Sequence, residues 1–74
     1  MAISRDKIDE WFGEKAKPNI PDRDSSQVEE IRIAARKLAT VILANTPASS
    51  DQSVAIRKVR DAQANAFSAI AFKD

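Results

Sequence analysis

Two arginines in the middle of the chain are the residues best suited to chemistry. Arg32 and Arg36 are four positions apart, so a helix places both on one face, and Lys37 follows directly. A guanidinium group is a planar fork that matches phosphate oxygens. Lys58 lies in a second basic cluster at 57–60. This pattern predicts an anion-binding surface in which Arg32, Arg36 and Lys58 contact phosphate.

Trp11 and Phe12 are two of the four aromatic residues in the chain, and they are adjacent. An aromatic ring near arginines suits a nucleotide, because the ring stacks on the base while the cations neutralise the phosphate. We therefore predict that Trp11 and Phe12 stack on a base or close over it. The alternative is structural: the aromatic pair attaches the first helix to the others, and the basic residues form a solvated face paired with nearby carboxylates.

Catalysis is poorly supported by the residue types. The chain has no histidine and no cysteine, which removes the usual general base, the thiol nucleophile and the commonest metal ligands. Gly13 is the only glycine, so there is no glycine-rich phosphate loop. Glu29 and Glu30 are adjacent and point to different parts of a helix surface. We expect a protein that is not an enzyme and that uses no cofactor and no metal ion.

The composition predicts one small domain that depends on a partner. A chain of 74 residues is marginally stable alone, and without cysteine it has no disulfide. Of its 32 hydrophobic residues 13 are alanines, so each helix buries little area unless it approaches another backbone closely. We therefore expect a homo-oligomer. The net charge of +1 does not favour a nucleic-acid polymer as partner. No signal peptide or membrane span is evident, since the longest apolar run, 38–44, is too short.

Helix start and stop signals divide residues 1–74 into three parts. Ser4 is placed to cap a short helix over 5–12, and we expect Gly13 to end it in the left-handed conformation, completing a first part over 1–13. Residues 14–24 contain Pro18 and Pro21 and read as a linker. Residues 25–74 read as two helices that form a long antiparallel hairpin around Pro47. The predicted fold class is all-α.

Each hairpin helix carries its own start signal and its own apolar stripe. Two capping boxes are expected, Ser26 with Glu29 and Ser49 with Gln52. The apolar stripe of the first helix comprises Val28, Ile31, Ala35, Leu38 and Ile42, widened by Ala34 and Val41, and that of the second comprises Ala55, Ile56, Val59, Ala62, Ala66, Ala69 and Ile70. Four large apolar residues lie off these stripes and predict packing between subunits: Ile33, Leu43, Phe67 and Phe72.

The stretch from Asp9 to Phe72 resembles a family of small phage proteins, the anti-CBASS cyclic-nucleotide sponges, which are related to the Thoeris anti-defence sponges. The segments that carry the resemblance are Trp11-Phe12 with Pro18, Glu30-Ile31-Arg32, 34–39, Val41-Ile42, Pro47, Ser49, Asp51, Ala55-Ile56, 58–62, Ala66 and Ile70-Ala71. The chain departs from the family in two places. It has Asn65-Ala66-Phe67 where an aromatic-Ala-Asn triplet is expected, and Ser50 where relatives often carry a basic residue.

The resemblance implies a homohexamer, built as a trimer of dimers, that binds cyclic oligonucleotide messengers of bacterial immunity, chiefly cyclic dinucleotides such as cyclic GMP-AMP. It implies that the ligand is held intact, that CBASS signalling is thereby blocked, and that the protein acts in the cytoplasm of the infected host. Two alternatives remain: a sponge for a cyclic ADP-ribose-type Thoeris signal, and a helical module that binds only protein. A duplex-DNA reader is less favoured, because both main helices look too long for a short recognition helix.

Overall fold

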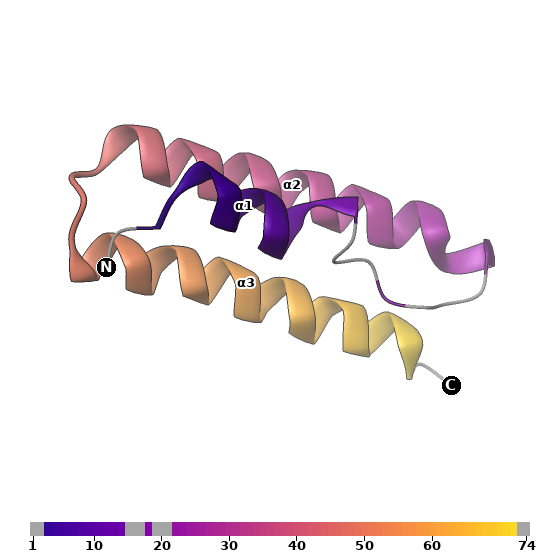
Figure 1. Ribbon diagram of the computed structural model, residues 1–74. Coiled ribbons are helices and arrows are strands. Elements are labelled where there is room, and N and C mark those ends of the chain that lie inside the picture. Colours follow the sequence, from indigo (N-terminus) through magenta and orange to yellow (C-terminus); the bar gives the residue numbers. More distant parts are fainter. Residues whose placement is uncertain (1–2, 15–17, 19–21, 73–74) are drawn as a thin grey trace.

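The computed structural model describes residues 3–14, 18 and 22–72, and most of these residues are helical. The elements in chain order are α1 (Arg5–Phe12), a one-turn 3-10 helix η2 (Asp22–Asp24), α2 (Ser25–Asn45) and α3 (Ser50–Ala71). The described residues contain three α-helices and no strand, which confirms the all-α prediction. The chain reverses direction between α2 and α3, and these two helices lie alongside each other, with α1 resting against them (Figure 1).

The helix α1 begins as predicted and ends differently. The Ser4 hydroxyl accepts a hydrogen bond from the Lys7 backbone N–H at 3.4 Å. Gly13, however, has φ −86° and ψ −175°, so it is extended rather than left-handed, and that prediction is wrong. Glycine is needed here for a different reason. A Cβ atom at this position would overlap the carbonyl oxygen of Asp9.

The start of α2 corrects one expected capping box. Asp24 occupies the N-cap position and makes no side-chain capping bond, while Ser26 already lies inside the helix. Because η2 runs directly into α2, the helix begins at Ser25, two residues before the start that Ser26 as N-cap would give. Ser26 therefore cannot act as the capping residue for Glu29.

The turn between α2 and α3 confirms the other cap and adds a role for Gln52. The Ser49 hydroxyl accepts from the Gln52 backbone N–H at 3.2 Å. The Gln52 side chain reaches the opposite way: its Nε2 donates to the carbonyls of Leu43 at 3.3 Å and Thr46 at 3.1 Å. Carbonyls in the last turn of a helix have no intrahelical donor, so Gln52 satisfies the end of α2 from the start of α3.

The core lies where α1 rests on the other two helices. Its buried residues are Ile3, Ile8 and Phe12 from the N-terminal segment, Ala35 and Ala39 from α2, and Ile56 from α3. Burying these side chains is the main gain in free energy on folding, at about 25 cal/mol per Å² of apolar surface. The core therefore sits on the side of α2 and α3 that α1 covers.

The position of α1 splits the apolar stripes predicted for α2 and α3. Along α2, Val28, Ala35 and Ala39 are buried, whereas Leu38 is 52% and Val41 47% exposed. Phe67, which we expected to pack between subunits, is instead buried, at 7% exposure. We call the uncovered apolar surface between α2 and α3 the open face. It comprises Ile31, Ala34 and Leu38 of α2 and Val59, Ala62 and Ala66 of α3, and no residue of α1 lines it.

Candidate functional site

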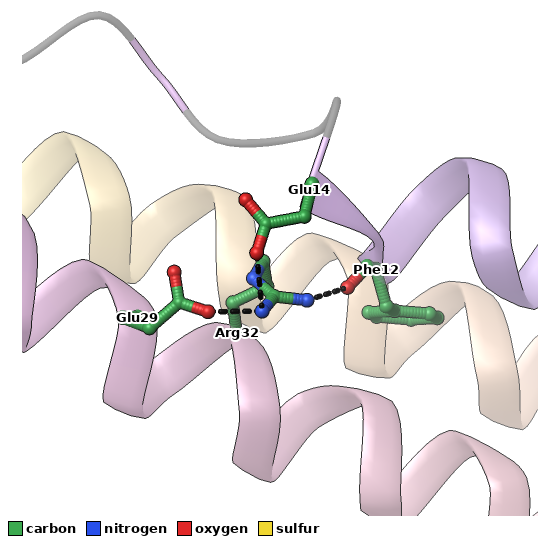
Figure 2. Close-up of polar contacts among 4 residues, drawn as sticks. All are labelled: Phe12, Glu14, Glu29 and Arg32. Carbon is green, nitrogen blue, oxygen red and sulfur yellow. Dashed lines mark hydrogen bonds and ion pairs between the residues drawn. The ribbon is translucent and has the colours of Figure 1, made fainter.

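Arg32 does not lie on the surface but at the junction of α1 and α2. Only 6% of the residue is exposed. As Figure 2 shows, its guanidinium donates to the backbone carbonyl of Phe12 at 3.0 Å, to the Glu14 carboxylate at 3.4 Å and to the Glu29 carboxylate. The hydrogen bond to Glu29 is the main cause that raises the pKa of Arg32, while burial opposes it. The group stays protonated. Protein acceptors bind Nη1 and Nη2, whereas the buried Nε has no acceptor among the described residues.

Two side chains together hold the end of α1. Arg32 of α2 donates to the Phe12 carbonyl, and Gln63 Nε2 of α3 donates to the Trp11 carbonyl at 2.9 Å. The last carbonyls of a helix lack intrahelical donors, and a cation there also complements the helix dipole. Arg32 and Gln63 thus cap α1 in place of a left-handed glycine. This corrects the expected role of Arg32, which anchors α1 and is not presented to a phosphate in solution.

The two aromatic residues also serve α1. Phe12 is fully buried, so a base cannot stack on it while the core is intact, which corrects its predicted role. Trp11 is half-buried, and the Arg60 guanidinium lies 4.3 Å from its ring centroid, with the Lys7 ammonium at 5.8 Å. These are cation–π distances. The aromatic pair therefore attaches α1 to α3, as the structural alternative anticipated.

Arg36 is a predicted site residue that the structure does present to solvent. It lines a hollow of about 230 Å³ between α1 and α2 together with Arg5, Asp9 and Thr40. It also lines a hollow of about 420 Å³ on the outer side of α2 with Lys37 and Thr40, and Arg32, although only 6% exposed, reaches the wall of this hollow as well. Its guanidinium is paired with the Asp9 carboxylate at 2.5 Å, and both side chains are about half exposed. We call Arg5, Arg36, Lys37 and Thr40 the Arg36 surface.

The charges around Arg36 differ between its two sides. The largest neighbouring hollow, about 510 Å³, is lined by Asp6, Asp9, Glu10 and Glu14 as well as Arg36. Four carboxylates repel an anion there. The Arg36 surface offers three cations and one hydroxyl donor, which suit phosphate oxygens, but these residues are divided between the two smaller hollows. The Asp9 carboxylate that pairs with Arg36 also lines the hollow with Arg5, so the hollow with Lys37 is the more positive of the two.

The sequence did not predict Thr40 and Arg5 as part of this surface, and it predicted Lys58, which lies elsewhere. Thr40 follows Arg36 by one helical turn and could have been found from that spacing. Arg5 had no such signal, because only the packing of α1 on α2 brings it near Arg36. Lys58 is exposed on α3 and shares none of the three hollows that Arg36 lines. The structure brings Arg36 and Lys37 together but not Lys58.

The fold and this surface define a class of protein: a small three-helix protein with a cationic patch at the α1–α2 junction. Comparisons with protein-family models, curated proteins and solved structures find no match to the chain. Across residues 3–14, 18 and 22–72, no helix combines the length and apolar character needed to cross a membrane. Within the same ranges, no three acidic side chains are grouped so that they could hold a metal ion.

Proposed function

We propose that this chain is a non-catalytic sponge for cyclic oligonucleotide immune messengers, chiefly cyclic dinucleotides such as cyclic GMP-AMP. In this proposal it is encoded by a phage, acts in the cytoplasm of the infected bacterium and blocks CBASS signalling. The observation that carries the proposal is the Arg36 surface, where Arg36 and Thr40 line two adjoining hollows, one shared with Arg5 of α1 and the other with Lys37. The resemblance of residues 9–72 to the sponge family supplies the ligand class.

The ligand chemistry fits this surface on charge and symmetry. A cyclic dinucleotide carries two phosphates and two bases in a ring with near two-fold symmetry. A dimer with a two-fold axis presents the same residues to both halves of such a ring. The proposed assembly is a homohexamer of antiparallel helical hairpins, arranged as a trimer of dimers. Charge-assisted hydrogen bonds from Arg36 to phosphate contribute about 1.5–3 kcal/mol.

Within one chain the two predicted parts of the site are separated. Trp11 contacts Arg60 of α3, whereas Arg36 pairs with Asp9 on the α2 side of α1. In the proposed complex, phosphate binds at the Arg36 surface, and a base stacks on Trp11 in place of Arg60. Stacking of a base on an aromatic ring contributes about 1–3 kcal/mol. The two contacts come from different copies of the chain.

The test measures whether the protein removes a cyclic dinucleotide and returns it unchanged. Protein is incubated with cyclic GMP-AMP, free ligand is assayed after ultrafiltration, and the protein is then denatured. Depletion followed by recovery of intact ligand supports a sponge. Linear product means a hydrolase, and absence of depletion by the wild type refutes the proposal.

A pair of arginine variants locates the site. We expect Arg36→Ala to weaken binding about 10- to 100-fold, the equivalent of about 1.5–3 kcal/mol. Arg57→Ala is the matched control, since Arg57 is an exposed arginine of α3 and lines none of the hollows around Arg36. Equal affinity of the two variants by calorimetry would remove Arg36 from the site.

The same assay separates the two alternatives. A sponge for a cyclic ADP-ribose-type signal uses the same phosphate contacts, so a competition panel of both ligand classes decides between them. The open face favours the second alternative, a helical module that binds only protein. In that case no nucleotide raises the melting temperature, whereas a true ligand at 100 times its Kd adds about 2.7 kcal/mol of stability.

A further inference from the structure

The apolar residues of the open face are spaced so that two copies of α2, packed antiparallel, could place them against each other. Ile31 and Leu38 are seven residues apart on α2, about two helical turns, with the small residue Ala34 between them. Ile31 and Ala34 line two neighbouring hollows, of about 450 and 330 Å³, so the apolar surface is continuous along α2 and α3. Leu38, which lines the second of these hollows, is 52% exposed. Isolated exposed apolar side chains are normal, but a continuous apolar surface of this kind marks an interface.

Two charges of opposite sign flank this surface at the same spacing. Glu30 and Lys37 are also seven residues apart, so they lie in one row along α2, and both are exposed. Glu30 lines a hollow with Ile31 and Ala34, and Lys37 follows two turns later, where the hollow beside Arg36 begins. Neither forms an ion pair in the part of the chain that the structure describes. The midpoints of the charged pair and of the apolar pair fall on either side of Ala34. A two-fold axis near Ala34 therefore brings Ile31 close to Leu38 of the second copy and Glu30 close to Lys37 of the second copy.

We propose that the open face binds a second copy of this chain through an antiparallel α2–α2 contact with its two-fold axis at Ala34. In that seam Ile31 of each copy packs on Leu38 of the other, and Glu30 of each copy pairs with Lys37 of the other. Ala34 at the crossing lets the axes approach toward the lower end of the usual 8–10 Å. The inference rests on the assembly part of the proposed function and does not need the ligand.

The seam covers part of one long side of the molecule. The chain measures about 41 × 18 × 17 Å, so even a whole long side is no larger than the roughly 800 Å² that each partner buries in a standard interface, and we expect a small interface with weak association. A helix packed along α2 covers the exposed part of Leu38 and places polar residues at the rim. This is the usual anatomy of a protein interface.

The test uses charge reversal, because a two-fold seam turns each single change into two repulsive contacts. Dimer dissociation is measured by sedimentation equilibrium for the wild type, Glu30→Lys, Lys37→Glu and the double variant. Each single variant is expected to weaken association about tenfold, and the double variant to return to within about twofold of the wild type. Arg57→Glu, an exposed charge of α3 outside this groove, is the matched control and is expected to change association by less than twofold.

The outcomes separate this inference from the proposed function. Circular dichroism establishes that each variant is folded, and Leu38→Ser provides an independent disruption that does not depend on charge. A wild type that stays monomeric at 1 mM, or a double variant as weak as the single ones, overturns the seam, even if the ligand is depleted. Restored association in the double variant, together with no nucleotide bound by the wild type, supports the seam and rejects the sponge.

Discussion

Replacing Arg32 by methionine is the sharpest test of how α1 is held. The change keeps much of the side-chain length and apolar stem but removes every donor of the guanidinium. The Phe12 carbonyl loses its donor, and the carboxylates of Glu29 and Glu14 lose their cation. Leaving a buried acceptor without a donor costs about 1–3 kcal/mol. The two carboxylates cost less, because Glu14 is 71% exposed and is solvated by water once it is released.

We expect Arg32→Met to lower the free energy of unfolding by about 2–3 kcal/mol in total. Against the 5–15 kcal/mol that a folded domain has in all, this is a large effect. Gln63→Leu should cost less, about 1 kcal/mol. It removes the donor to the Trp11 carbonyl but also removes Gln63 Oε1, a buried acceptor that has no donor among the described residues.

Urea unfolding followed by two probes measures the effect. Trp11 is the only tryptophan and lies on α1, so its fluorescence reports the docking of α1, whereas circular dichroism is dominated by the longer α2 and α3. In Arg32→Met the fluorescence transition should move to lower urea and precede the loss of ellipticity. Arg57→Met is the control, because Arg57 is exposed on α3. A shift below about 0.5 kcal/mol, with Trp11 emission unchanged, would show that Arg32 does not anchor α1.

Two further substitutions probe α1 and the Arg36 surface. Gly13→Ala should destabilise the chain by at least about 1 kcal/mol, because the added Cβ atom overlaps the Asp9 carbonyl oxygen. Thermal melting of this variant beside the wild type measures the effect. An unchanged melting temperature would contradict the close approach of Gly13 to Asp9. Asp9→Asn frees Arg36 from a half-exposed ion pair worth about 0.2–1 kcal/mol, so affinity for cyclic GMP-AMP by calorimetry should rise up to about fivefold. Asp6→Asn, in the same acidic hollow, is its control. Equal effects of Asp9→Asn and Asp6→Asn would mean that only the overall charge matters.

Local chemistry was enough to place several helix boundaries. Ser4 and Ser49 each carry a hydroxyl that bonds the backbone N–H three residues on, and this bond is made within one turn of chain. Pro47 follows the last residue of α2 by two positions, where a proline cannot continue the helix, and Gln52 then satisfies carbonyls at that end. The all-helical class followed from the same signals, because helix periodicity and caps are properties of neighbouring residues.

Only the tertiary structure decided which side of α2 and α3 is covered. Neighbouring apolar stripes on one helix are separated by a fraction of a turn, so Ala35 and Leu38 were equally good candidates for the core. Docking of α1 buried Ala35 and left Leu38 exposed. The same docking buried Arg32, because the last carbonyls of α1 have no donor within that helix and accept hydrogen bonds from other helices. The sequence determined the helices themselves, but the long-range contacts of α1 determined that Arg32 is buried and that Arg36 stays half exposed.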